Sequence, residues 1–393
     1  MEAWKEYKIG DLCSISSSKR IFANEYQLSG IPFYRGKEII EKQKGESITN
    51  ELYISEDRYN EIKDKFGTPQ KGDMLLTSVG TLGIPYIVKD EKFYFKDGNL
   101  TWFYNFRGIN NVYLYYWFLS PAAQYLINAK AIGSTQKALT IETLKKFDLL
   151  LPPINVQDKI VSILKSLDDK IELNRRINDN LEQQMQATFD ELIMNEELPR
   201  TKFLKDYAFV NPSRTIKKDE VKRYIDMSSL PTKGSFPSDW IDKPYNGGMK
   251  FQNGDTIMAR ITPCLENGKT AYINFLEEGE VAFGSTEYIV MSAHEGIPSE
   301  MFYFLARNED FVSYAVAHMN GSSGRQRVSA TDIENYIMPD IPIHSIEMFG
   351  KKTYAVMKCI KNYSLENRKL SSLRDTLLPR LMSGELKVNE INM

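Results

Sequence analysis

One stretch near the middle of the chain constrains its fold more than any other. Between Asn155 and Pro199 the sequence contains no glycine or other proline, and apolar residues recur at alternating steps of four and three. The stripe comprises Ile160, Leu164, Leu167, Ile171, Leu181, Met185 and Leu192. This periodicity is typical of a helix that packs lengthwise against another helix. At 1.5 Å per residue, about 35 to 40 residues would form a helix on the order of 55 Å long.

A second segment of the same kind closes the chain. Its stripe comprises Phe349, Val356, Ile360, Tyr363, Asn367, Leu370, Leu373 and Leu377. Asn174 and Asn178 fall on the first stripe, and Asn367 corresponds to Asn174 in the second. A polar Asn between apolar residues weakens a helix pair but fixes its register. We therefore predict paired helices with Asn174 and Asn367 as register residues. The alternative is that each helix packs separately on its own globular domain and that each Asn is solvated.

The segments that precede the two helices repeat one order of signals. Residues 1–154 hold strand-type runs broken by polar turn stretches such as 42–49, then a helical stretch at 111–131 that Pro121 divides. A polar loop, a short helical turn and an apolar strand follow and end at Pro152 and Pro153. Such a mixture predicts an α+β domain.

The second half repeats this order at a long interval. GDTIMARITP (254–263) parallels GDMLLTSVGT (72–81), and a second helical run and polar loop follow in the same sequence. A repeat this long indicates a duplicated domain. We therefore predict an α+β chain with two α/β domains in pseudo-twofold repeat, separated by two long helices that pair as an antiparallel coiled coil. The expected boundaries are 1–154 and 198–343 for the domains, 155–197 for the first helix, and 344–393 for the second helix and tail.

Composition excludes several classes of protein. The formal net charge of −2 argues against a uniformly basic nucleic-acid binder, although local basic patches remain possible. The three cysteines form no CxxC pair and the three histidines are scattered, so we expect neither a disulfide framework nor a metal site. No apolar run approaches 18 residues, and the N-terminus has no apolar signal core. We expect a cytoplasmic chain with no membrane contact.

Polar loops at the same point of both halves form the first candidate site. Small residues there let backbone N–H groups approach a phosphate, and long donors can reach phosphates or base edges. The candidate residues are Ser134, Thr135, Gln136 and Lys137 in the first half, and Ser322, Ser323, Arg325, Gln326 and Arg327 in the second. A polar Gly-Ser loop before a helix can also be a loop without further function. Its recurrence at the same point of both halves gives the binding interpretation about equal weight.

The Gly-Asp segments supply the second group of candidates. Each places a turn before an apolar strand that ends in small, hydroxyl or basic residues, namely Ser78, Thr81, Arg260, Thr262 and Lys269. The alternative is structural, because Gly-Asp is a favourable turn into a strand. A basic run within 202–223 could follow a phosphate backbone or could simply be a solvated face.

Catalytic signatures are absent from the sequence. It contains no GxxxxGK[ST], no GxGxxG after a strand, and neither HExxH nor GxSxG. We therefore expect a binding protein that performs no chemistry alone.

The C-terminal LSSLRDTLLPRLMSGEL (370–386) closely resembles the end of type I restriction–modification specificity (S) subunits. The resemblance continues through six further segments: KIGDL (8–12), GDMLLTSVGTLG (72–83), LPPINVQDKIVSILKSLDDKIELNRRI (151–177), GDTIMARITPCLENGKTAYI (254–273), GSTEYIV (284–290) and NGSSGRQRV (320–328). Two departures are small. Val156 precedes Gln157 where the family often has Glu, and residues 341–343 hold one proline fewer than usual.

The resemblance implies a non-catalytic DNA-binding subunit. Each target-recognition domain would bind one half of a bipartite sequence in double-stranded DNA. The helix pair would set the unread spacer and dock two methyltransferase subunits. No cofactor would bind this chain, because S-adenosylmethionine belongs to the methyltransferase subunit. A restriction and translocase subunit would complete the enzyme.

Three alternatives remain open from the sequence. An orphan or phase-variable specificity subunit of a methylation-only complex would look the same. A methyltransferase or nuclease fused to its own recognition domains lacks the expected motifs. A coiled-coil scaffold that binds no DNA explains the helices but not the duplicated loop-rich domains.

Overall fold

The computed structural model describes residues 4–45, 48, 50–133, 137–194, 197–322 and 324–388. The chain forms two compact units. The first unit comprises the chain up to Glu172 together with the chain from Lys369 onward, and the second comprises Leu173–Arg368. The first unit is therefore discontinuous in sequence, and the second is inserted into it.

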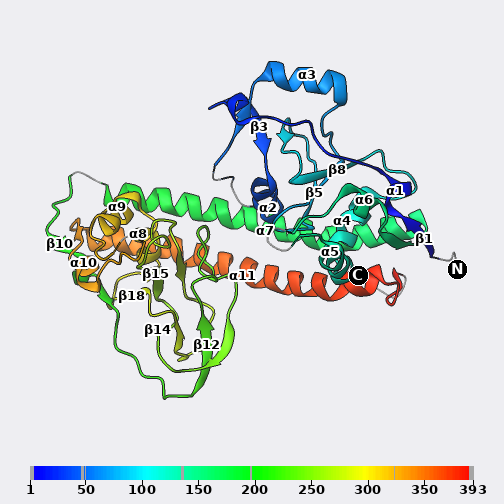
Figure 1. Ribbon diagram of the computed structural model, residues 1–393. Helices are drawn as coiled ribbons and strands as arrows, with labels where there is room; N and C mark the ends of the chain where they lie inside the picture. The colour runs from blue at the N-terminus through cyan, green and yellow to red at the C-terminus, as the bar shows by residue number, and fades with distance from the viewer. Residues whose placement is uncertain are drawn as a thin grey trace. The chain divides into compact units, whose positions relative to one another are not determined.

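Two long helices run through both units. Helix α7 (Ile154–Ile193) and helix α11 (Ile343–Met382) each contain 40 residues and appear in green and in orange to red in Figure 1. The absence of glycine and of internal proline in α7 permits this length, whereas α11 contains Pro379 only near its end.

The two helices pack antiparallel, as the periodicity predicted. In the first unit the core combines Leu164 from the first half of α7 with Leu381 from the end of α11. In the second unit it combines Phe189 from the end of α7 with Phe349 from the first half of α11. The predicted α+β class with antiparallel long helices is confirmed. The apolar stripe identified in the sequence does not include Phe189, although this side chain is completely buried.

One residue of the second stripe was assigned wrongly. Leu373 is 47% exposed, and its neighbour Arg374 lies against α7 instead. Arg374 Nη1 donates a hydrogen bond to Asp168 Oδ1 at 2.9 Å, and Tyr116 donates to the other oxygen of Asp168 at 2.7 Å. The physical reason is spacing, because steps of three and four from Asn367 lead through Leu370 to position 374.

Asparagines occupy the contact between the helices within the second unit. Asn174 is fully buried, and its Nδ2 donates to Asn367 Oδ1 at 2.9 Å and to Glu366 Oε2 at 2.7 Å. One turn further along, Asn178 Nδ2 donates to Ser364 Oγ at 3.2 Å. Asn174 is thus not solvated, in contrast to the alternative considered from the sequence.

The first unit contains strands and helices of modest length. The strands are β1 (Lys5–Lys8), β2 (Ser14–Ser16), β3 (Ile31–Tyr34), β4 (Tyr53–Ile54), β5 (Met74–Thr77), β6 (Pro85–Ile87), β7 (Tyr94–Phe95), β8 (Leu100–Tyr104) and β9 (Asp148–Leu151). The helices are α1 (Ile9–Leu12), the 3₁₀ turn η1 (Ala23–Glu25), α2 (Gly36–Lys44), α3 (Glu56–Phe66), α4 (Asn111–Leu119), α5 (Pro121–Lys130) and α6 (Ile141–Lys145).

The second unit contains a related set. The strands are β10 (Lys202–Phe203), β11 (Ala208–Val210), β12 (Val221–Ile225), β13 (Ile241–Pro244), β14 (Met249–Phe251), β15 (Thr256–Ala259), β16 (Thr270–Tyr272), β17 (Ala282–Gly284), β18 (Tyr288–Ala293) and β19 (Ile337–Met338). The helices are the 3₁₀ turn η2 (Leu204–Asp206), α8 (Met301–Leu305), α9 (Glu309–Ala317) and α10 (Ala330–Glu334).

The sheet topology of the two units is the same in its main parts. The four-stranded order β2-β8-β5-β6 in the first unit matches β11-β18-β15-β16 in the second, and the two-stranded ribbon β1-β9 matches β10-β19. A further sheet in each unit, β4-β3-β7 in the first and β13-β12-β17-β14 in the second, contains a parallel pair, β3 with β7 and β12 with β17. Pro121 begins α5 directly after α4, so the predicted division of the 111–131 helical stretch is confirmed.

The repeated Gly-Asp segments form the same turn in both units. Gly72 and Gly254 both have φ of 91°, a conformation that disfavours other residues. Asp73 and Asp255 accept hydrogen bonds from the backbone N–H three residues earlier, at 2.8 and 2.7 Å. Each Gly-Asp segment therefore forms a turn that leads into a strand, as the structural alternative expected. In this way it also positions the residues that follow β5 and β15.

The polar stretch 42–49 was assigned wrongly at its start. Residues 36–44 form α2, which begins with a hydrogen bond from Arg35 N to Glu38 Oε2 at 2.8 Å and ends at Gly45 with φ of 75°. Strong helix formers between these two caps outweigh the local polarity.

The packing of α7 in the first unit gives a test of the fold. Leu164→Ala should lower the free energy of unfolding by about 2–5 kcal/mol, because the side chain is fully buried in the core. Leu373→Ala, on a helix of the same unit but 47% exposed, is the matched control and should change it by less than about 0.5 kcal/mol. Urea unfolding of the full chain measures both values, and equal losses would contradict the observed packing.

Candidate nucleic-acid interface

Each unit joins the two candidate segments by the same backbone hydrogen bonds. In the first unit Leu139 N donates to Ser78 O at 2.9 Å, and Gly80 N donates to Lys137 O at 3.3 Å. In the second unit Val328 N donates to Arg260 O at 3.0 Å, and Thr262 N donates to Gln326 O at 3.1 Å. We call these joined segments the first loop pair (78–81 with 137–139) and the second loop pair (260–263 with 325–328).

A third strand end completes both loop pairs. Ser78 N donates to Asn99 O at 2.8 Å just before β8, and Arg260 N donates to Glu287 O at 3.0 Å just before β18. Isolated β-bridges join Val79 to Ala138 and Ile261 to Arg327. The polar loops and the Gly-Asp strands, which the sequence indicated separately, therefore lie together in each unit.

This shared backbone pattern makes the two units comparable position by position. Ser78 corresponds to Arg260, Asn99 to Glu287, and Ala138 to Arg327. All three positions are uncharged in the first loop pair and charged in the second. The same frame therefore presents two chemically different surfaces.

An arginine–glutamate pair joins the second loop pair to the strand end before β18. Arg327 Nε donates to Glu287 Oε2 at 2.8 Å, and Arg327 Nη2 donates to Glu287 Oε1 at 2.7 Å. Arg327 Nη1 donates to the backbone oxygen of Arg325 at 2.9 Å. The side chains remain 37% and 27% exposed, so this geometry is formed at a surface.

The charged groups around the Glu287 carboxylate are mainly positive. The hydrogen bonds from Arg327 lower the pKa of the Glu287 carboxyl group, and the nearby charge of Arg260 lowers it further. Arg260 Nε is buried and has no hydrogen-bond partner within the part of the chain that the structure describes. One carboxylate thus faces two guanidinium groups, which leaves a net positive charge where the loops meet.

The other candidates of the second unit differ in their exposure. Lys269 Nζ donates to Met227 O at 2.6 Å, and Thr262 Oγ1 lies 3.9 Å from Met319 Sδ. Ser322 and Arg325 are exposed, and Gln326 is half-buried. Ser323 lies outside the described residues.

The candidates of the first unit are divided in the same way. Ser78 is buried, and its Oγ lies 2.6 Å from Thr101 Oγ1, so its side chain holds the strand end in place. Thr81 and Lys137 are exposed. Ser134, Thr135 and Gln136 lie outside the described residues.

A basic pocket beside the first loop pair was not found from the sequence. Its volume is about 570 Å³, and Arg35, Lys37 and Lys44 of the α2 region line it together with Thr81 and Asn99. Arg35 pairs with the buried Glu38, while Lys37 Nζ lies 3.5 Å from Glu41 and its side chain is 55% exposed. If residues 36–44 had been predicted as a helix, Lys37 and Lys44 would have been placed two turns apart. That placement would have indicated the basic surface.

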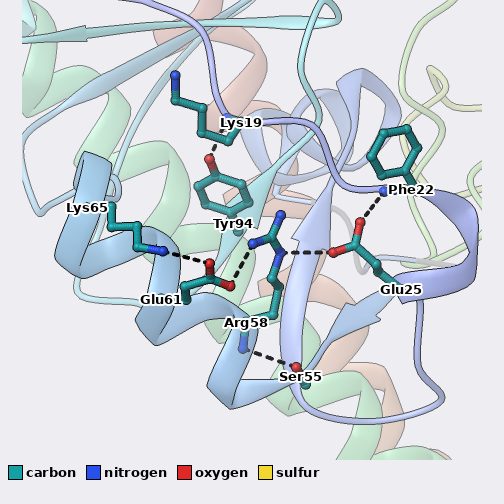
Figure 2. A network of polar contacts seen from close by, with 8 residues as sticks. All are labelled: Lys19, Phe22, Glu25, Ser55, Arg58, Glu61, Lys65 and Tyr94. Atoms are coloured by element: carbon teal, nitrogen blue, oxygen red, sulfur yellow. Dashed lines mark hydrogen bonds and ion pairs between the residues drawn. The ribbon is translucent and has the colours of Figure 1, made fainter.

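A second charged cluster of the first unit is internally neutralised. Figure 2 shows Arg58 between two carboxylates, with Nε 2.8 Å from Glu25 Oε1 and Nη1 2.8 Å from Glu61 Oε2. Glu61 also accepts a hydrogen bond from Lys65 Nζ at 3.0 Å. This network fastens η1 to α3, and we assign it a structural role.

The basic run within 202–223 does not form one continuous face. The Arg214 side chain is 9% exposed and pairs with the buried Asp255 at 2.8 Å, while Lys222 lies 3.0 Å from Glu220. Arg223 donates to Phe275 O at 3.1 Å. Several of its charges therefore serve the fold of the second unit.

The described residues show no sign of two other kinds of site. Nowhere in the described ranges do three or more His, Cys, Asp or Glu side chains gather as a potential metal site. No helix in this part of the chain has the length and apolar character needed to cross a membrane. Fold and surface together define a recognition protein in which one frame occurs twice with different loops.

Comparison with known proteins agrees with this class. The family profile described as "Type I restriction modification DNA specificity domain" matches residues 1–183. A putative type I restriction enzyme specificity subunit of Haemophilus influenzae is 34% identical over 166 residues, which cover 42% of this chain and 40% of that protein. The MjaIX specificity subunit of Methanocaldococcus jannaschii is 25% identical over 99% of this chain and 94% of its own length.

A solved structure supports the fold along the whole chain. The S subunit of a type I restriction–modification system from M. genitalium superposes with a TM-score of 0.59 at 17% identity, covering 97% of this chain and 96% of that one. Along nearly its whole length the chain is similar to specificity (S) subunits of type I restriction enzymes, and residues 1–183 match their DNA specificity domain.

The lowered pKa of Glu287 predicts a pH dependence. A carboxyl group whose pKa is lower in the folded than in the unfolded state stabilises the fold above its unfolded pKa of about 4.3, and this contribution is lost as pH falls through the folded pKa. Glu287→Gln should therefore lower Tm by about 2 °C at pH 7 and by less at pH 3. Thermal scans at both pH values measure this.

The matched control is Glu277→Gln in the same unit. Its carboxylate is 83% exposed and lies 3.4 Å from Arg223, so a smaller change is expected. A Tm difference for Glu287→Gln that is the same at both pH values would contradict the assigned pKa direction.

Proposed function

We propose that this specificity subunit recognises a bipartite DNA sequence, with each target-recognition domain binding one half-site. The observation that carries the proposal is the duplicated frame, in which the same hydrogen bonds hold Ser78, Asn99 and Ala138 in one unit and the charged residues Arg260, Glu287 and Arg327 in the other. Two related frames with different side chains are suited to two different half-sites. The domains would be 1–154 and 198–343, as the sequence analysis expected.

The proposed contacts divide into two classes. Exposed residues at or beside the loop pairs, namely Thr81, Lys137, Ser322 and Arg325, would meet the DNA together with Arg260, Gln326, Arg327, Thr262 and the loop residues Ser134, Thr135, Gln136 and Ser323. Ser78 and Lys269 would act by holding the loop pairs in shape, because their polar atoms are bound within the protein. Phosphate contacts would position the protein, and base-edge contacts would give specificity.

The long helices would set the distance between the half-sites. Both helices are continuous across the boundaries between the units at residues 172 and 368. Asn174 and Asn367 would fix the register of the pair, because a shifted pairing would bury an amide without its partner. The register determines the length of the unread spacer.

The proposal includes partners and excludes a cofactor on this chain. Methyltransferase subunits, which bind S-adenosylmethionine, would dock on the helix pair, and a restriction and translocase subunit would join them in the cytoplasm. A complex that only methylates is the alternative, and the presence of a restriction subunit in the purified complex would distinguish the two.

The direct test is a map of methylated sites in the source genome with and without the gene for this chain. Loss of one bipartite motif on deletion is the expected result, and complementation with the gene should restore it. An unchanged map would contradict the proposal.

Lengthening the helices tests the spacer. Insertion of one helical turn into α7 after residue 172 and into α11 after residue 368 adds about 5.4 Å. Because one base pair rises about 3.4 Å, the spacer should lengthen by one or two base pairs while both half-sites stay the same. Insertion into α7 alone is the control and should impair recognition. Altered half-sites with an unchanged spacer would contradict the assigned role of the helices.

The basic pocket of the first unit gives a test of phosphate binding. Lys37→Ala with Lys44→Ala should reduce the affinity of the complex for its site about tenfold and lower the slope of log affinity against log salt by about 1–2, without changing the methylated sequence. The control is Lys63→Ala with Lys71→Ala, which removes equal charge from exposed residues of the same unit outside the pocket. Equal effects of both pairs would mean that the pocket contributes only general positive charge and no specific phosphate contact.

A further inference from the structure

We infer that Glu287 is a positioning residue, which directs the Arg327 guanidinium group toward a paired acceptor of the half-site bound by the second unit. This inference rests on the proposed function. Glu287 belongs to no candidate group identified from the sequence. The acceptor pair is either the O6 and N7 atoms of a guanine or two oxygens of one phosphate, since both have the spacing that a guanidinium group matches.

Arg327 keeps N–H donors that make no hydrogen bond with any described residue of the protein. A guanidinium group carries five N–H donors. Three of its nitrogens each donate one hydrogen bond within the protein, two to Glu287 and one to the backbone oxygen of Arg325. Two N–H groups remain, one on each terminal nitrogen. Arg327 can therefore bind a further acceptor pair without breaking its contacts with Glu287.

The contact with Glu287 also lowers the entropic cost of ordering Arg327. An exposed arginine side chain loses rotamer freedom when it binds, and this loss opposes binding. The bidentate contact to Glu287 fixes the Arg327 guanidinium group before DNA arrives, so less of this cost remains. A fixed donor pair also discriminates better, because it fits an acceptor pair at one place in the groove.

The negative charge of Glu287 is unusual for a surface that would bind DNA. A carboxylate at a DNA-binding surface repels phosphates, so its presence there needs a compensating function. Arg260 and Arg327 both contribute to the lowered pKa of Glu287, which keeps the carboxylate ionised. In the first unit the corresponding position is Asn99 and no arginine occupies the positions of Arg260 or Arg327. The glutamate is therefore found in the unit that has arginines at these positions, and the other unit has neither.

The experiment is a double-mutant cycle on the complex of the full chain with its methyltransferase subunit. Glu287→Gln keeps the size of the side chain and removes its charge. We expect discrimination against altered second half-sites to fall about tenfold, while affinity for unrelated duplex DNA rises. A merely destabilised protein would lose affinity for both. Recognition of the first half-site serves as the internal control.

Arg327→Ala completes the cycle. Alone it should weaken binding about tenfold or more, because it removes the donor and exposes the Glu287 carboxylate to DNA. In the Arg327→Ala background, Glu287→Gln should have no further effect on discrimination and should restore part of the affinity. Independent, multiplying effects on discrimination would overturn the inference.

Two further comparisons make the result decisive. Glu277→Gln removes the same charge from an 83% exposed residue of the same unit, and an equal effect on discrimination would overturn the inference. Glu287→Asp keeps the charge with a shorter reach, and it should give an intermediate result even if the Gln variant assembles poorly. Wild-type complex without any sequence preference would instead refute the proposed function itself.

The same data identify the acceptor. Relaxed preference at one base position of the second half-site indicates a guanine edge. A reduced salt slope in Arg327→Ala, with all base preferences retained, indicates a phosphate. Effects of equal size at both half-sites would contradict both assignments.

Discussion

The packing of each globular core against both long helices is the constraint on which the rest of the structure depends. Neither sheet system closes its apolar face alone. In the first unit that face is covered by the start of α7 and the end of α11, and in the second by the end of α7 and the start of α11. The helices are therefore parts of both hydrophobic cores as well as connections. A change in helix register would disturb both of these cores. The cores therefore help to hold the buried Asn174 amide in its position.

A rigid frame with variable loops explains how one fold serves two different recognition surfaces. The Gly-Asp turn, the central strands and the backbone bonds of the loop pairs are common to both units. The side chains that the frame presents are not. Basic groups come from α2 in the first unit and from the loop pair itself in the second. Because function lies in the presented side chains, the two units can diverge without loss of stability.

Periodicity and repetition in the sequence predicted the long helices, the duplication and the α+β class, because these depend on patterns spread over many residues. The location of individual side chains depends on their contacts in the folded chain, and such patterns do not contain these contacts. Leu373 was placed on the apolar stripe, whereas Arg374 occupies that position through its contact with Asp168. The assignments at the loops stay predictions. Their partners, such as Glu287 beside Arg327, are distant in sequence, and only the fold brings them together.

The insertion of the second unit into the first has a consequence for synthesis of the protein. The core of the first unit includes Leu378, Leu381 and Met382, which the ribosome produces only after the whole of residues 173–368. At about 5–20 residues per second, this interval is on the order of ten seconds or more. During it the second unit has all of its own residues before the first unit does. The N-terminal part of the chain must therefore remain incompletely packed, with apolar surface of α7 uncovered, until the last turns of α11 arrive.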